Sequence, residues 1–406
     1  MDDLRTELRQ TSGSFGEPGY TLDRLEVLKR RRERRSRIVA MAVAFAVVAL
    51  SGSLLWSAFT GAPPDGRTVG ESSGVENGRI SFIVGEFGGS MEGIQLATAV
   101  SDGSDRRILI DGVPENLTGG WSPDGSTIVV SRDLQDTPDG DSSIWMMSAD
   151  GSDLKQLTDG HVDHDAQWSP DGTRILFLRS SPDGELRCDG HLCRDAAPAI
   201  FIMNADGSGI RRVSDEPGLI VLGARWSPDG GRIVFIADTW ADDGREGLGI
   251  YVVRSDGTDP RRIVPGVNGA PQWSPSGERI LFQLGSRLVT VDSAGSDLRP
   301  LVEGFHRDVY FRWSPDGARL LYVRPVSPDQ GNELWVAAAD GSDEWLVAEN
   351  LQWPDASATW SPDGRLIAFA RDGDIWTVDV ESGAERQVTD TPTYESMPAW
   401  GAGDAS

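Results

Sequence analysis

Residues 121–125 read WSPDG, and this motif recurs along the chain, once in the variant form WSPSG, every 40 to 58 residues. The repeats begin at Trp121, Trp168, Trp226, Trp273 (the variant), Trp313 and Trp360. Proline presets φ for the first turn position, and glycine readily takes a left-handed conformation. The motif therefore predicts a strand that ends in tryptophan and then reverses through a tight hairpin turn.

Apolar-alternating strands follow each turn. The first of them reads TIVV, RILFL, RIVFI, RILF, RLLYV or LIAFA, starting at residues 127, 174, 232, 279, 319 and 366. A second strand with an Asp-Gly turn and a short basic-apolar strand come next, as in residues 143–153 and 154–158. Four strands in each unit of about 40–47 residues are typical of a β-propeller blade. We expect the tryptophan ring to pack between one blade and the next.

Incomplete units at the two ends predict how the ring closes. Residues 78–110 supply three strands without a preceding tryptophan strand, and residues 395–403, with Trp400, supply one strand alone. Together these fragments complete one blade, which leaves no free sheet edge. The predicted fold is all-β: a seven-bladed β-propeller over residues 78–400, closed by one C-terminal strand beside three N-terminal strands. Six- and eight-bladed rings are the alternatives.

The WSPDG turn, the I-x-F strand and the ADGS turn together resemble the propeller repeats of the TolB family, which also occur in prolyl-oligopeptidase-type peptidases. The resemblance covers residues 78–400 and implies an extracytoplasmic interaction module. Such repeats serve as scaffolds, docking surfaces and enzyme lids, so they are more specific for fold than for function. The sequence departs from TolB in its predicted membrane anchor, in seven blades in place of six, and in the lack of an α/β domain before the propeller.

Charge is distributed unevenly along this chain of net charge −25. Residues 1–37 carry ten Lys/Arg against seven Asp/Glu, whereas the rest of the chain carries 28 against 56. So acidic a bulk would repel phosphates, which excludes nucleic acid as a partner. We interpret the acidic residues as a solubilising surface.

A segment of 22 residues, 38–59, carries no charge and is long enough to cross a bilayer as a helix. The basic sequence KRRRERRSR at 29–37 precedes it, so the positive-inside rule places residues 1–37, which are partly helical, in the cytoplasm. Residues 60–77 are then a flexible stalk, the propeller lies outside the cell, and residues 401–406 are a tail. The predicted location is the cell membrane, with a single pass. A cleaved signal peptide is the alternative, but its leader and apolar core would both be shorter.

Cys188 and Cys193 are the only cysteines. In an exported domain two neighbouring cysteines are expected to form a disulfide, which here would be a local staple of a short loop. The alternative is a metal site that adds His191. Three candidate ligands within six residues lack the paired spacing of a zinc site.

Catalytic motifs are sparse. The only G-x-S-x-G match, GESSG at residues 70–74, falls in the predicted stalk without a strand before it or a helix after it. A metal-dependent lyase would need several histidines, and His161, His164 and His306 fall on loops of non-adjacent blades. Asp-rich stretches such as residues 136–141 could hold calcium, but turn chemistry explains most Asp-Gly pairs. The sequence therefore predicts a protein that is not an enzyme and needs no metal or cofactor.

The loops that enter the tryptophan strands vary from repeat to repeat, and we expect them to face the mouth of the central channel. Turn geometry and blade packing do not explain these residues, so they form the predicted binding surface. Its members are Asn116, Asp163, His164, Asn268, His306, Arg307, Asp308, Trp353, Tyr394 and Glu395. Trp353 is the strongest candidate, because it is a tryptophan outside the repeating position. Packing of its ring over the end of a blade is the alternative.

These patterns predict a non-catalytic, membrane-anchored propeller that binds a protein or glycan outside the cell, as an envelope sensor or scaffold. One alternative is a transmembrane regulator whose cytoplasmic segment engages a transcriptional regulator. Another is a metal-dependent propeller enzyme such as a polysaccharide lyase.

Overall fold

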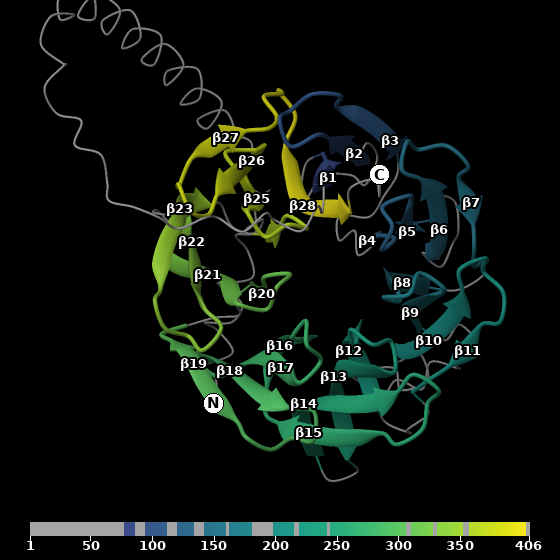
Figure 1. The fold of residues 1–406 in the computed structure, drawn as a ribbon. Helices are drawn as coiled ribbons and strands as arrows, with labels where there is room; N and C mark the ends of the chain where they lie inside the picture. The colour runs from purple at the N-terminus through teal and green to yellow at the C-terminus, as the bar shows by residue number, and fades with distance from the viewer. Residues whose placement is uncertain are drawn as a thin grey trace, which may run out of the picture. The chain divides into compact units, whose positions relative to one another are not determined.

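The structure, a computed structural model, describes residues 77–85, 94–111, 120–133, 142–159, 162–180, 198–214, 219–241, 244–305, 310–327, 331–351 and 357–402. These ranges contain 28 strands and no helix. The strands form sheets that follow one another around a ring, as Figure 1 shows. The all-β prediction is confirmed.

The first sheet joins the two ends of the described chain. In spatial order it contains β28 (Glu395–Ala402), β1 (Asn77–Val84), β2 (Gln95–Ala99) and β3 (Arg107–Asp111). An eight-stranded sheet comes next, with β4 (Gly120–Trp121), β5 (Thr127–Asp133), β6 (Ser142–Ser148), β7 (Lys155–Gln156), β8 (Val162–Trp168), β9 (Arg174–Ser180), β10 (Ala199–Asn204) and β11 (Arg211–Arg212). It consists of two sets of four strands, joined by one parallel pair, Ser142 with Val162.

Four further sheets have four strands each, in sequence order. The first two contain β12 (Leu219–Trp226), β13 (Arg232–Ala241), β14 (Gly244–Arg254) and β15 (Arg261–Pro265), then β16 (Asn268–Trp273), β17 (Arg279–Leu284), β18 (Arg287–Asp292) and β19 (Arg299–Glu303). The last two contain β20 (Phe311–Trp313), β21 (Arg319–Ser327), β22 (Gly331–Ala338) and β23 (Trp345–Leu351), then β24 (Ala358–Trp360), β25 (Leu366–Arg371), β26 (Asp374–Asp379) and β27 (Glu385–Gln387).

The C-terminal strand β28 pairs antiparallel with β1, which is the pairing that the sequence predicts. Ile80 lies opposite Trp400, and Ser81 lies opposite Ala399. The Ser81 hydroxyl donates to the Ala399 carbonyl at 3.2 Å across 318 residues of sequence. The pairing covers an edge of β1 that would otherwise present unpaired backbone groups.

Each turn that follows a repeat tryptophan is held by its own side chains. The Gly172 N–H donates to the Ser169 carbonyl at 2.9 Å, and Gly172 has the expected left-handed φ of 68°. Ser169 Oγ donates to Asp171 Oδ1 at 2.5 Å and accepts from the Arg174 N–H at 2.9 Å. Asp171 Oδ1 also accepts from the Thr173 N–H at 3.0 Å. The same contacts recur after Trp121, Trp226, Trp313 and Trp360.

The repeat tryptophans pack in the cores between sheets. Trp273, 7 % exposed at the end of β16, packs with Val234 and Ile250 of the preceding sheet and with Phe282 of its own. Losing a buried side chain of this size costs about 3–5 kcal/mol. Corresponding clusters include Trp121, Trp168, Trp226, Trp313, Trp360 and Trp400. The recurrence of tryptophan therefore has a packing cause.

Several predicted features lie outside the described residues. They are the cytoplasmic segment 1–37, the apolar segment 38–59, all of the stalk 60–77 except its last residue, and the pair Cys188 and Cys193. Of the tail 401–406 only the first two residues are described. In the ranges that the structure does describe, no helix is long and apolar enough to cross a membrane.

Candidate functional site

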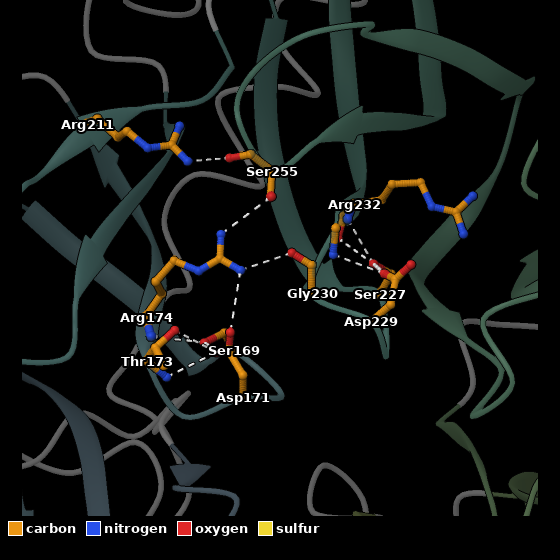
Figure 2. Close-up of polar contacts among 11 residues, drawn as sticks. Ser169, Asp171, Thr173, Arg174, Arg211, Ser227, Asp229, Gly230, Arg232 and Ser255 are labelled. Carbon is orange, nitrogen blue, oxygen red and sulfur yellow. Dashed lines mark hydrogen bonds and ion pairs between the residues drawn. The ribbon is translucent and has the colours of Figure 1, made fainter.

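The surroundings of Trp226 show how a repeat closes one sheet against the next. Arg174, at the start of β9, places its guanidinium carbon 4.8 Å from the centroid of the Trp226 ring, within cation–π range. The same guanidinium donates to the Gly230 carbonyl at 3.1 Å and to Ser255 Oγ at 3.4 Å (Figure 2). Trp226 is only 8 % exposed. The same clamp joins Arg232 to Trp273, at 4.7 Å, and Arg319 to Trp360, at 5.3 Å.

The aspartates of the turns are held ionised by hydrogen bonds. The Ser169 hydroxyl, then the N–H and hydroxyl of Thr173, lower the pKa of Asp171 to about 2. Hydrogen bonds from the corresponding serine hydroxyls also lower the pKa of Asp124 and of Asp229. These carboxylates stay charged at neutral pH and shape the turns.

Trp313 occupies the same place in its repeat but is covered differently. Arg279, the counterpart of Arg174, turns toward its own sheet, where it donates to Thr290 Oγ1 and to Asp297 Oδ2, both at 2.9 Å. Among the described residues no arginine stacks on the Trp313 ring, in contrast to Trp226. Trp313 is partly exposed.

A cavity of about 270 Å³ opens beside Trp313. It is formed by β16, β20 and β24, the first strands of three successive sheets, and by the turns that follow two of them. Its lining residues are Gln272, Trp273, Pro275, Arg312, Trp313, Ser314, Pro315, Thr359 and Trp360. Each of the three strands contributes its repeat tryptophan and the residue just before it. The cavity therefore combines aromatic walls with four polar side chains, which are Gln272, Arg312, Ser314 and Thr359.

Among the described residues that line the cavity, Arg312 is the only cationic one. Its Nε donates to the hydroxyl of Tyr310, and its guanidinium carbon lies 5.1 Å from the centroid of the Tyr310 ring. Within the described part of the chain, Arg312 forms no ion pair. Arg225, which precedes Trp226 in the same way, lies 3.0 Å from Asp165 Oδ2. The two arginines thus share a position in the repeat but not an acidic partner.

Asp163 and Glu395, two of the residues in the predicted binding surface, are fully buried in ion pairs. Asp163, in β8, accepts from Nε and a terminal nitrogen of Arg179 at 2.7 and 2.8 Å. Glu395 Oε1, at the start of β28, accepts from Arg106 at 2.8 Å and from Thr391 Oγ1 at 3.0 Å. Both carboxylates lie in strands and not in entry loops: Asp163 is the second residue of β8, and Glu395 is the first residue of β28. Their arginines compensate the cost of burying the charge.

The remaining residues of the predicted surface are not brought together by the described structure. His164 is partly buried in β8, and Tyr394 is partly buried just before β28. Asn268 begins β16, where it pairs with Gln283. Asn116, His306, Arg307, Asp308 and Trp353 lie outside the described residues. In the described ranges, no three His, Cys, Asp or Glu side chains are grouped so that they could hold a metal ion.

The sequence analysis did not select Gln272, Arg312 or Thr359. A signal for them exists, because the residue just before the repeat tryptophan is variable. It reads Gly120, Gln167, Arg225, Gln272, Arg312, Thr359 and Ala399 around the ring. What the sequence does not reveal is which of these side chains border a cavity.

Comparison with known proteins gives local matches. Residues 331–401 match the family described as the dipeptidyl peptidase IV (DPP IV) N-terminal region. Over 97 residues the chain is 32 % identical to the Tol-Pal system protein TolB of Alcanivorax borkumensis, which covers 23 % of this chain and 21 % of that protein. The described fold agrees with this match. The described part of the chain is a β-propeller that resembles TolB over part of its sequence.

The TolB-like propeller also resembles proteins of other kinds. It is 26 % identical over 220 residues to the uncharacterized peptidase YuxL of Bacillus subtilis, covering 51 % of this chain and 29 % of YuxL. The chain therefore spans under a third of either relative. A puromycin hydrolase S511A mutant complexed with PGG matches with a TM-score of 0.59 and 16 % identity, over 78 % of this chain and 52 % of that one. An oligogalacturonate lyase in complex with manganese matches with a TM-score of 0.53 and 13 % identity, over 78 % and 87 %.

The prediction that this protein is not an enzyme is wrong, because the comparisons do not allow enzymes to be excluded. One relative is named a peptidase, and the two solved structures with a similar fold are a hydrolase and a lyase. The physical reason lies in the repeat itself. Its residues serve turn geometry and blade packing, so propellers with and without catalytic activity share them. The lack of a recognised catalytic motif therefore decides nothing.

Proposed function

We propose that this chain displays a seven-bladed, TolB-like propeller outside the cell on one membrane-spanning segment, and that the propeller binds a ligand in the cavity beside Trp313. The observation that carries the proposal is the cavity lining. Arg312, Gln272 and Thr359 line a space between three sheets. Gln272 also bonds to the Phe311 carbonyl of the next sheet, as Gln167 does to the Ala224 carbonyl. Arg312 has no contact of this kind among the described residues. A concave site that combines apolar walls with a few convergent polar groups is the usual form of a ligand site.

Binding can be tested by photo-crosslinking in intact membranes. A photoreactive residue at position 359, in the full-length protein, should give an adduct. The matched control is position 222, because Leu222 on β12 is 56 % exposed but does not line the cavity. An adduct at 359 and none at 222 supports the cavity as the binding site. Equal adducts at both positions, or none at 359, would exclude it.

The number of blades is supported by the sheet order. Five sheets have four strands, and the eight-stranded sheet divides into two antiparallel sets of four linked by a single parallel residue pair. Deleting residues 395–406 would expose an edge of β1 and remove Trp400 from its cluster, at a cost of about 3–5 kcal/mol or more. Deleting 403–406 alone is the control. Equal melting temperatures for the two truncations would contradict closure through β28.

The membrane topology rests on residues 29–59, a basic block followed by an uncharged segment. Protease added to intact spheroplasts should degrade the chain beyond residue 60 and spare the N-terminus. A soluble mature chain that starts near Pro63 would contradict the anchor. If residues 1–37 are protected, they are placed where they could engage a cytoplasmic regulator.

A second candidate function is enzymatic, and the likeness to YuxL, to a puromycin hydrolase and to an oligogalacturonate lyase favours it. Under this proposal the cavity would hold the substrate. The test is an assay of the purified full-length protein with peptide amides and with polygalacturonate. It is run with and without manganese, because the structure of the oligogalacturonate lyase is a complex with that metal. Turnover that the Arg312→Ala substitution abolishes would support this candidate, and no turnover on either substrate class would count against it.

A further inference from the structure

We propose that the cavity beside Trp313 is a carboxylate-binding site, in which Arg312 pairs with the carboxylate of a small ligand. This inference rests on the proposed binding function and adds the chemistry of the ligand. The ligand class is a monocarboxylate of about the size of one sugar or one amino acid residue, because the cavity measures about 270 Å³.

The first argument is electrostatic. The protein carries a net charge of −25, so an anion is repelled from most of its surface. Arg312 places a permanent positive charge in the cavity, and within the described residues no carboxylate neutralises it. Its Nε is already used by the Tyr310 hydroxyl. The two terminal nitrogens remain, and a guanidinium edge matches the two oxygens of a carboxylate.

The second argument is that Arg312 is held in place before any ligand binds. The hydroxyl of Tyr310 accepts from Nε, and the guanidinium lies over the Tyr310 ring at 5.1 Å. A fixed side chain loses little conformational entropy when it binds an anion. Arg312 is therefore a preorganised donor.

The third argument concerns the neutral lining. Gln272 lines the cavity without a charge, and its amide nitrogen donates to the Phe311 carbonyl at 2.7 Å. Thr359 adds a hydroxyl, and the indole and proline walls offer apolar contact to the carbon part of a ligand. One guanidinium with neutral neighbours suits a single negative charge better than a doubly charged phosphate.

The fourth argument is the matched residue Arg225. It precedes Trp226 as Arg312 precedes Trp313, but it pairs with Asp165 and donates to the Ala224 carbonyl at 2.7 Å. Its charge is used within the fold. An arginine at this place in the repeat therefore does not by itself offer a charge to a ligand; among the described residues Arg312, unlike Arg225, has no acidic partner.

The test is a titration of the full-length protein in detergent by isothermal calorimetry or ligand-observed NMR. The probes are glucuronate and N-acetylglycine, with glucose and N-acetylglycinamide as their uncharged counterparts. We expect at least one acid to bind with Kd of about 1 mM or tighter, more weakly at high salt, and its neutral counterpart to bind at least about tenfold more weakly. Binding of glucuronate alone assigns a sugar carboxylate, and binding of N-acetylglycine alone assigns a peptide carboxylate.

The variants Arg312→Ala and Arg225→Ala test whether Arg312 is the residue that binds the carboxylate. Arg312→Ala should raise the Kd of the acid by about tenfold or more, while the melting temperature stays the same. Arg225→Ala should lower the melting temperature and leave the affinity unchanged. The proposal is wrong if neither acid binds, if neutral and charged probes bind equally, or if Arg312→Ala binds like the wild type. An adduct at position 359 alongside any of these results would leave the binding function standing and reject only the carboxylate.

Discussion

Trp226 and Trp313 end the first strands of two sheets and occupy the same position in the repeat, but their surroundings differ. Trp226 lies under the guanidinium of Arg174, and the arginine just before it is paired with Asp165. Among the described residues no guanidinium lies over Trp313, and the arginine just before it, Arg312, forms no ion pair. A cavity opens beside Trp313. In the described part of the chain both regions contain a tryptophan and two arginines, but an arginine side chain covers the ring only at Trp226.

The difference originates in a residue on the neighbouring strand. Arg279 bonds to the hydroxyl of Thr290, whereas the equivalent position beside Arg174 is Ile202, which offers no hydrogen bond. Arg79 behaves like Arg279, because it donates to Thr98 Oγ1 at 3.1 Å and to Asp105 Oδ2 at 2.7 Å. An arginine at this place bonds within its own sheet when a threonine is present. Otherwise it reaches the next tryptophan.

The largest effect should come from removing the two tryptophans in turn. Trp226→Ala should destabilise the propeller by about 3–5 kcal/mol, because it deletes a nearly buried ring and its cation–π contact. Trp313→Ala should cost less, by about 1–2 kcal/mol, since its ring is already partly exposed. Urea unfolding of both variants measures the difference. Equal losses would show that the two regions are packed alike.

A smaller effect should separate the two arginines. Arg225→Ala removes an ion pair and hydrogen bonds to the buried Asp165 and should cost about 1–2 kcal/mol. The side chain of Arg225 is 34 % exposed, which reduces the loss below that of a buried pair. Arg312→Ala should change stability by less than about 0.5 kcal/mol. The melting temperatures of the two variants provide the check. A greater loss from Arg312→Ala would mean that its charge serves the fold.

Thr290→Val should convert the open region toward the closed one. Without the threonine hydroxyl, Arg279 loses one partner and is freed to stack on Trp313. A double-mutant cycle between residues 279 and 313 should give a coupling energy near zero in the wild type and about 0.5–1 kcal/mol in the Thr290→Val background. An unchanged coupling energy would reject the threonine as the deciding residue.

The smallest effect is expected from the turn aspartates as pH changes. The folded-state pKa of Asp171 is about 2, below its usual 3.8, so its contribution is present above about pH 4 and lost as pH falls toward 2. Asp171→Ser should lower the melting temperature at pH 7, and this deficit should vanish near pH 2.

The variant turn provides the reverse test. Its Ser276 stands where the other turns have aspartate, and it bonds to Ser274 Oγ at 3.1 Å. Ser276→Asp should raise the melting temperature at pH 7 but not near pH 2. A gain that is independent of pH would contradict the role of the charge.

The sequence by itself determined the features that depend on local chemistry. Proline and glycine decide the turn geometry, and alternating apolar residues decide the strands. The unmatched strand around Trp400 decides its pairing with β1. Each of these follows from a few neighbouring residues or from the need to cover a sheet edge.

Only the tertiary structure decided which side chains meet. Gln272, Arg312 and Thr359 come from three different repeats, and they share one cavity because successive sheets stand side by side in the ring. Asp163 and Glu395 are charged, yet both are buried, and each pairs with an arginine: Arg179 on β9 and Arg106 just before β3. The directions of the Arg174 and Arg279 side chains depend on residues of the adjacent strand, Ile202 and Thr290. Contacts of this kind join residues far apart in sequence, so no local pattern encodes them.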